Sequence, residues 1–253
     1  MRRIKLIVAY DGTEYSGWQI QPEAPTIEMY LDKAIHELTG ENVHVTGASR
    51  TDAGVHAYGN VAVFDTESTI PGDRFTFALN RFLPDSIVIQ DSWEVSGDFH
   101  PRHCNTRKTY EYRILNTAVP LPQKRNFTWH VAGSIDIDKM REAAAYIVGE
   151  HDFKSFCCVR TQAESTVRTI YSLEVLQESS EIIIRIKGNG FLYNMVRIIT
   201  GTLIQVGKGR FKPEYVKQML EAKDRTVAGQ TAPPQGLTLV GIEYVDKDDA
   251  KIG

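Results

Sequence analysis

Hydrophobic positions in the first 95 residues alternate between strand and helix periods. Residues 2–10 form a short apolar run that ends in a polar loop, as a strand does. From 27 to 38 apolar residues recur at helical spacing, with Thr26 as a candidate N-cap and Gly40 as the stop. The remaining predicted elements are strands at 43–47, 58–66 and 86–95, and a helix at 72–84. This β-α-β-β-α-β order predicts a ferredoxin-like arrangement.

The second half has a similar pattern and predicts a second, related α+β half. A strand at 106–116 precedes a helix that we expect Gly149 to close, and two strand patterns follow, separated by a short polar turn. The predicted elements are strands at 106–116, 165–177, 181–188 and 237–245, and helices at 137–149, 191–207 and 213–223. We therefore predict two domains, residues 1–104 and 105–253.

The helix predicted at 191–207 is unusually apolar. Between Gly188 and Gly207 the single charged residue is Arg197, so we expect most of the helix surface to be buried. A buried guanidinium left without an anion costs about 3–5 kcal/mol. Either Arg197 extends to the surface, or a distant part of the chain supplies a carboxylate. The residues between Gly188 and Gly207 do not predict a membrane span, because polar groups there would be costly in lipid.

Asp52 is the natural candidate for that carboxylate. It lies in GASRTDAGVHA, residues 47–57, where Gly, Ala and Ser leave room for a bulky substrate. The alternative is an ordinary turn aspartate that bonds its own backbone. Arg50, two residues earlier, adds a positive charge to the same loop.

A strand with the sequence KTYEYR, residues 108–113, is the third candidate feature. Tyr110 and Tyr112 fall on one face with Lys108 beside them. Such tyrosines either stack on a nucleobase or pack in the core.

The charge is uneven along the 253 residues, although the net charge is only −3. Residues 1–105 sum to −7 and residues 106–253 to +4. Between His100 and His130 six basic residues accompany Glu111 alone, which suits either phosphate contacts or a solvated face. They are Arg102, Arg107, Lys108, Arg113, Lys124 and Arg125. Three cysteines, two of them adjacent, favour a reducing compartment over a disulfide framework.

Two other motifs fail on spacing. HPRHC, residues 100–104, has zinc-like spacing but lacks a second Cys/His pair. GTLIQVGKG, residues 201–209, resembles a phosphate loop but its glycines are one residue too far apart, it ends a helix, and it lacks the Ser or Thr after lysine.

Six segments together resemble the TruA family of tRNA pseudouridine synthases, in the order that this family has them. They are YDGTEYSGWQ (10–19), GASRTDAGVHA (47–57), FHPRHCNTRKTYEYRI (99–114), HDFKSF (151–156), GNGFLYNMVRIITG (188–201) and PPQGLTL (233–239). The resemblance implies an α+β pseudouridine synthase fold: two ferredoxin-like halves forming a mixed, mostly antiparallel sheet flanked by helices, with a basic cleft between them. It implies a cytoplasmic isomerase that acts on uridines 38, 39 and 40 of the tRNA anticodon stem-loop, as a homodimer, without cofactor, metal or membrane.

The resemblance also implies a role for each site residue. Asp52 is the catalytic carboxylate, which either adds to C1′ or removes the C2′ proton, and Arg197 pairs with it. Tyr110 is a catalytic residue that stacks on the uracil and helps to move the C5 proton, with Leu237 on the other side of the base. Arg50 either fills the space of the flipped nucleotide or binds phosphate, and Arg102 and Lys108 lie on the basic strip that follows the stem. The alternatives are an inactive tRNA-binding or tRNA-folding module and, more remotely, a metal-dependent phosphohydrolase built on Asp11, Asp52, His56 and HPRH.

Overall fold

A computed structural model describes residues 1–158 and 164–245. The chain divides into two compact units. Unit 1 comprises Met1–Thr106 and the chain from Leu239 onwards, and unit 2 comprises Arg107–Thr238. The last residues of the predicted second domain, 246–253, lie outside the described residues.

Unit 1 contains a ferredoxin-like set of elements. Strand β1 (Arg2–Tyr10) lies between β3 (His56–Thr66) and β4 (Ile87–Val95), and both pairings are antiparallel. The two-residue strand β2 (Thr46–Gly47) pairs with β3, so the predicted strand at 43–47 is much shorter than expected. Apolar residues of β1 and β3 that point toward the helices are almost fully buried.

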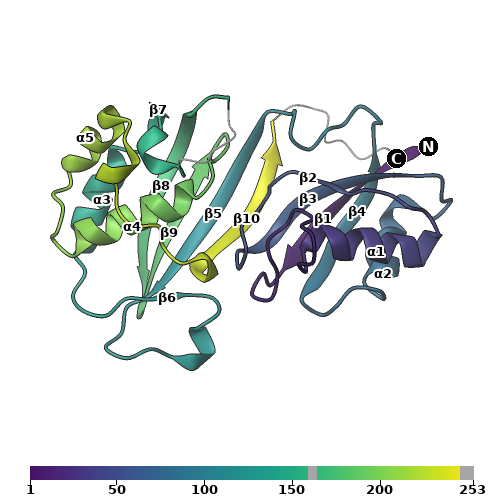
Figure 1. The fold of residues 1–253 in the computed structure, drawn as a ribbon, viewed down its shortest axis with the longest axis horizontal. Helices are drawn as coiled ribbons and strands as arrows, with labels where there is room; N and C mark the ends of the chain where they lie inside the picture. The colour runs from purple at the N-terminus through teal and green to yellow at the C-terminus, as the bar shows by residue number, and fades with distance from the viewer. Residues whose placement is uncertain (159–163, 246–253) are drawn as a thin grey trace. The chain divides into compact units, whose positions relative to one another are not determined.

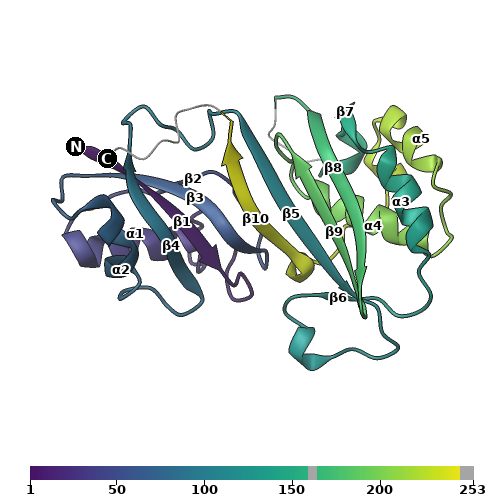
Figure 2. The ribbon, with the colours of Figure 1, turned by 180° about the vertical axis from the view of Figure 1, so that it is seen from behind.

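Two helices cover one face of these strands (Figures 1 and 2). Helix α1 (Ile27–Thr39) follows Thr26 and ends at Gly40, whose φ of 76° is left-handed, as predicted; the Thr26 side chain, however, makes no cap hydrogen bond. Helix α2 (Phe75–Leu79) is shorter than predicted. It stops because the Asn80 side chain hydrogen-bonds both the N–H and the C=O of Ile89 on β4.

Unit 2 is also built from an antiparallel set of strands. Its strands lie in the order β5-β9-β8-β7, all antiparallel, and β6 adds a parallel pair to β5. The strand bounds are β5 (Thr106–Leu115), β6 (Trp129–His130), β7 (Gly149–Asp152), β8 (Val167–Glu178) and β9 (Glu181–Gly188). The predicted hairpin is confirmed, with Ser179 at φ 55° in its turn.

Three helices pack together on one face of the unit 2 strands (Figures 1 and 2). They are α3 (Ile137–Ala145), α4 (Met195–Gly207) and α5 (Tyr215–Ala222). The prediction that Gly149 closes the first of these is wrong: α3 ends at Ala145, and Gly149 opens β7 with φ 114°. Helix α4 begins four residues later than predicted, because Asn194 is left-handed at φ 63°.

When β6, β7 and α5 are left out, the chain order β5-α3-β8-β9-α4-β10 has the β-α-β-β-α-β pattern of unit 1. Its last strand, β10 (Leu237–Tyr244), belongs to unit 1 from Leu239 onwards. The predicted α+β class, with a mixed, mostly antiparallel sheet flanked by helices, is confirmed. Short 3₁₀ turns complete the structure: Gly72–Arg74, Pro122–Lys124, Lys154–Phe156, Arg225–Val227 and Pro234–Gly236. None of the helices in the described ranges is long and apolar enough to cross a membrane.

Candidate active site

The loop of residues 47–57 presents Asp52 at a tight turn of unit 1. The Asp52 carbonyl accepts a hydrogen bond from the Val55 N–H at 3.2 Å, and Gly54 in the turn has a left-handed φ of 75°. Asp52 is half-buried, between buried Thr51 and exposed Ala53. The carboxylate is therefore carried by a backbone turn of defined shape.

A second sequence motif, residues 10–19, braces this loop. The Trp18 N–H donates to the Thr51 carbonyl at 3.0 Å, and the Gly54 N–H donates to the Tyr15 carbonyl at 3.3 Å. The hydroxyl oxygens of Tyr10 and Thr51 are 2.7 Å apart and buried. Two motifs that are 30 residues or so apart in sequence thus form one structure around Asp52.

Glycines make this close approach possible. A Cβ on Gly12 would lie 2.0 Å from the Val55 carbonyl oxygen, which no side chain tolerates. At Gly17, whose φ is 96°, a Cβ would lie 2.7 Å from the Thr51 carbonyl oxygen. The small residues at 10–19 are needed to seat the loop, which is a structural role that the sequence pattern alone did not reveal.

Arg50 is exposed on this loop between two anchored neighbours. On one side the Asn60 side chain donates to the Ser49 carbonyl at 2.9 Å, and on the other Thr51 bonds Tyr10. Arg102 is exposed as a whole residue, but its partly buried Nε donates to the Gly47 carbonyl at 2.7 Å. Burial, and then the positive charge of Arg50, lowers the pKa of Arg102, so both predicted RNA-binding arginines of unit 1 lie in one neighbourhood.

His56 is buried, and the roles that the family resemblance implies for the site residues do not include it. Its Nδ1 lies 3.0 Å from the Gly12 amide nitrogen and 3.1 Å from Asp11 Oδ1. An amide N–H can only donate, so Nδ1 must be the unprotonated, accepting nitrogen in this arrangement. Asp11 Oδ1 already accepts from the Thr13 amide and hydroxyl, so His56 serves as a further brace between the two loops.

In unit 2, β5 carries Tyr110 and Tyr112 two residues apart and therefore on one face of the strand. Tyr110 is 9% exposed and meets the Phe191 ring edge-to-face at 5.2 Å. Tyr112 is fully buried, its hydroxyl donates to the Pro233 carbonyl at 2.6 Å, and burial raises its pKa. Lys108, half-buried, lies opposite Gly188 on β9.

Arg197 is held at the start of α4 by two neutral acceptors. Its Nε donates to the Ala232 carbonyl and its Nη1 to Asn194 Oδ1, both at 2.8 Å. Most other residues of α4 are buried, as predicted. The left-handed conformation of Asn194 turns its side chain toward the guanidinium, so the orientation of Arg197 is built into the helix start.

The segment before β10 contacts both Arg197 and Tyr112. The Ala232 N–H donates to the Arg197 carbonyl at 3.1 Å, and a Cβ on Gly236 would lie 2.6 Å from the Tyr112 ring. Leu237 follows directly and is 6% exposed. Within unit 2 the structure therefore connects Arg197, the tyrosine strand and Leu237; Asp52, Arg50 and Arg102 belong to unit 1.

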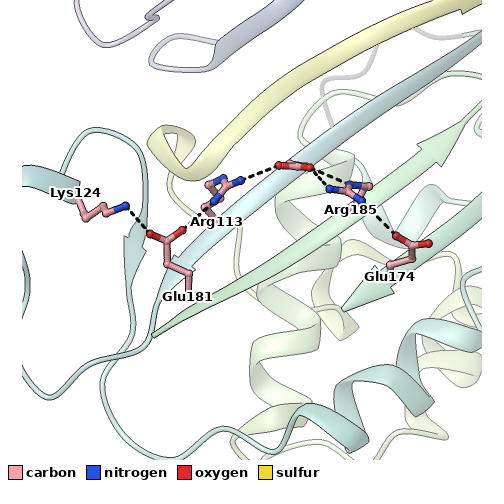
Figure 3. A network of polar contacts seen from close by, with 6 residues as sticks. Arg113, Lys124, Glu174, Glu181 and Arg185 are labelled. Carbon is pink, nitrogen blue, oxygen red and sulfur yellow. Dashed lines mark hydrogen bonds and ion pairs between the residues drawn. The ribbon is translucent and has the colours of Figure 1, made fainter. Parts of the chain in front are cut away.

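The basic strip predicted between His100 and His130 is only partly available for phosphate. Figure 3 shows Arg113 and Lys124 in a network of ion pairs with acidic residues. Lys124 lies 2.8 Å and Arg113 3.0 Å from Glu181, and Arg113 and Arg185 both contact the buried Glu111. Burial opposes ionisation of Glu181, but these two cations outweigh it and hold its pKa below the ordinary value.

The zinc and metallohydrolase alternatives gain no support from the geometry. The His100 and His103 rings stack at 3.9 Å, and the Cys104 thiol donates to the His100 carbonyl. Within residues 1–158 and 164–245, no three His, Cys, Asp or Glu side chains are grouped to hold a metal ion.

Comparison with known proteins identifies relatives over nearly the full chain. A family model described as tRNA pseudouridine synthase matches residues 6–103 and 143–245. The chain is 51% identical over 245 residues to tRNA pseudouridine synthase A of Ruminiclostridium cellulolyticum, which covers 96% of this chain and 100% of that protein. The same coverage applies to the synthase A proteins of Thermoanaerobacter sp. strain X514, 48% identical, and Brevibacillus brevis, 47% identical, each over 244 residues.

Proposed function

The chain belongs to the tRNA pseudouridine synthase family, and from this premise we propose that it converts uridine to pseudouridine at positions 38, 39 and 40 of the tRNA anticodon stem-loop. The observation that carries the proposal is the doubly braced loop that presents Asp52. A carboxylate on a rigid turn, with Arg50 exposed beside it, suits a reaction at a sugar carbon within RNA.

The reaction breaks the C1′–N1 bond, turns the uracil and joins C5 to C1′; the C5 proton is released and N1 takes up a proton, so that the product is an isomer of uridine. Breaking the glycosidic bond gives C1′ oxocarbenium character, which a nearby carboxylate stabilises. Asp52 supplies that carboxylate, either by adding to C1′ or by removing the C2′ proton to give a glycal. The detached uracil is itself the acceptor, so the reaction needs neither water nor a cofactor or metal.

Arg197 is the proposed partner of Asp52. Its guanidinium donates to the Ala232 carbonyl and to the Asn194 side chain, and these two hydrogen bonds fix the orientation of the planar fork that would meet a carboxylate. Pairing with Asp52 keeps the carboxylate ionised in a closed site.

The remaining site residues bind the flipped nucleotide and the RNA backbone. Tyr110 stacks on the uracil and Leu237 packs on its other side. Arg50 either takes the place of the flipped base or binds phosphate, while Arg102 and Lys108 contact phosphates of the stem. Flipping costs a few kcal/mol, which these backbone contacts offset. We place the enzyme in the cytoplasm as a homodimer, following its resemblance to the family.

Pseudouridine mapping tests the proposed position specificity. Unmodified tRNA transcripts would carry a single uridine at 38, 39 or 40, and the products would be analysed by chemical labelling of pseudouridine. Product at these positions, and none at a uridine outside the anticodon stem-loop, is expected. Tight binding without any product would instead establish an RNA-binding module that lacks catalysis.

A further inference from the structure

The loop between β5 and β6, residues 116–128, displays large apolar side chains that the proposed reaction does not use. Val119 is 69%, Leu121 43% and Phe127 45% exposed. The loop extends away from the strands of unit 2 (Figures 1 and 2). Apolar side chains gathered on one exposed segment mark a binding surface.

A cavity of about 370 Å³ lies in this loop. Its volume falls within the range of small-molecule sites in proteins. Its lining combines apolar and polar groups, namely Pro120, Leu121, Pro122, Arg125, His130 and Gln235. Proline and leucine suit the flat faces of an aromatic ring, and the polar groups suit hydrogen-bonding atoms at its edge. A nucleobase has this combination, because its flat faces are apolar and its edge carries hydrogen-bonding atoms.

Local hydrogen bonds fix two of these polar groups. His130 Nε2 lies 2.8 Å from the Thr117 carbonyl oxygen, so Nε2 carries the proton and Nδ1 is an acceptor for a base N–H. Arg125 Nη1 donates to the Pro122 carbonyl at 3.0 Å, which holds the guanidinium against the loop. The wall of the cavity that contains Arg125 and His130 is therefore preformed.

The opposite wall is fixed through Gln235. This residue lies in the turn Pro234–Gly236, which the Tyr112 hydroxyl anchors at the Pro233 carbonyl. Gly236 permits the turn to rest against the Tyr112 ring, where any side chain would clash. Gln235 is two residues from Leu237, and two residues span at most about 7 Å of chain.

Charge favours RNA as the occupant. From Thr117 to His130 the chain contains Lys124 and Arg125 and no acidic residue. Lys124 is paired with Glu181, whereas Arg125 lies within ion-pair distance of no acid in the described part of unit 2. A guanidinium that has no acidic partner and lies beside proline rings can stack on a base or contact its phosphate.

We propose that this cavity binds an unstacked nucleobase of the tRNA that neighbours the reacting uridine. The assignment to a neighbouring base rests on the proposed function, because it uses the position of Leu237 at the target. Single-stranded loops of RNA supply such bases, and a protein reads them by stacking and by contacts to their edges. The cavity thereby contributes to the choice of RNA substrate.

A binding cycle with abasic RNA tests this proposal. Anticodon stem-loop RNAs would carry one abasic nucleotide at each unpaired position in turn, and Kd would be measured at one salt concentration for the wild-type protein, Arg125→Gln and Lys124→Gln. Loss of one particular base should weaken wild-type binding about tenfold. Arg125→Gln should bind intact RNA about as weakly as the wild-type protein binds that abasic RNA. Removal of the same base should then cause no further loss of affinity in this variant. Lys124→Gln removes the same charge outside the cavity and should retain the sensitivity.

Equal affinity for every abasic RNA, or additive losses in Arg125→Gln, would overturn the proposal. A change of oligomeric state in Arg125→Gln by analytical ultracentrifugation, with RNA binding unaltered, would also overturn it and identify the loop as a protein interface. Pseudouridine formation on the intact RNA is measured separately in the same preparations. Absence of product there counts against the proposed function, while the binding cycle still decides whether the cavity takes a base.

Discussion

Tyr10 and Thr51 share a buried hydrogen bond, with their hydroxyl oxygens 2.7 Å apart. Tyr10 is the last residue of β1, and Thr51 directly precedes Asp52. The Asn60 side chain, from β3, lies 3.3 Å from the same Tyr10 hydroxyl. The proposed catalytic loop is thus attached to two central strands of unit 1 by one tyrosine.

Tyr10→Phe should therefore affect the loop more than the fold. Loss of the hydroxyl should lower the free energy of unfolding by about 1–2 kcal/mol, because Thr51 and Asn60 lose a buried partner. We expect kcat to fall while KM for tRNA changes little, since Tyr10 positions Asp52 and does not contact RNA. Urea unfolding and steady-state kinetics measure both effects. Tyr58→Phe is the control, because Tyr58 is 63% exposed on β3; equal effects of the two variants would contradict the positioning role.

Gly12→Ala should destabilise unit 1 strongly. The added Cβ would meet the Val55 carbonyl 2.0 Å away, and backbone cannot yield as a flexible side chain does. Overpacking of this kind costs about 3 kcal/mol. Gly97→Ala is the matched control, because a Cβ there has no neighbour within 4 Å. Thermal unfolding of both variants checks the difference, and a wild-type Tm in Gly12→Ala would show that the two loops do not depend on this contact.

Arg197→Lys should leave the protein folded and nearly inactive. Lysine keeps the charge but cannot donate to the Ala232 carbonyl and Asn194 in the geometry of a guanidinium. We expect kcat to fall on the order of 100-fold, the usual effect of losing one well-placed electrostatic group. Arg210→Lys, exposed beyond the end of α4, is the control for the substitution itself. Turnover near the wild-type level in Arg197→Lys would remove this residue from the site.

Stability should fall in acid partly because of Glu181. Burial raises the pKa of this carboxyl, but Lys124 and Arg113 lower it by more than burial raises it. The net pKa therefore lies below the ordinary value of 4.5. The folded protein then binds its proton less readily than the unfolded chain, so the stabilisation is full above about pH 4.5 and is lost as pH falls through the folded pKa. Glu181→Gln should lower the free energy of unfolding by about 1 kcal/mol near neutral pH. It should also make the free energy of unfolding depend less on pH in the acid range.

Urea unfolding from about pH 3 to about pH 7 measures this dependence. Glu178→Gln, exposed on the same hairpin, should keep the wild-type profile. An unchanged acid limb in Glu181→Gln would show that the ion pairs of Figure 3 add no pH-dependent stability.

Features that depend on local pattern could be predicted from the sequence. The order of the longer elements, the β8–β9 hairpin and the burial of α4 all follow from hydrophobic period and the scarcity of charge, whereas the short strands β6 and β7 were not predicted. Gly40 ends α1 as expected, because a left-handed residue there is a property of the helix end itself.

Features that depend on distant contacts could not be predicted in this way. Helix α2 stops early because Asn80 bonds Ile89 across a chain reversal. The basic strip is partly neutralised by Glu181, which is nearly 70 residues from Arg113 in sequence. Residues 10–19 can brace residues 47–57 only because Gly12 and Gly17 lie against that loop. This requirement follows from a contact between two distant segments, so the local sequence pattern does not reveal it.

The central claim is that Asp52 performs the isomerisation, and tritium release from uridine C5 tests it most directly. Unmodified tRNA labelled at C5 would be incubated with wild-type protein, Asp52→Ala and the exposed-residue control Asp85→Ala, while tRNA binding is measured in parallel. We predict release by the wild-type and control proteins, and none by Asp52→Ala although it still binds tRNA. Full release by Asp52→Ala would contradict the account.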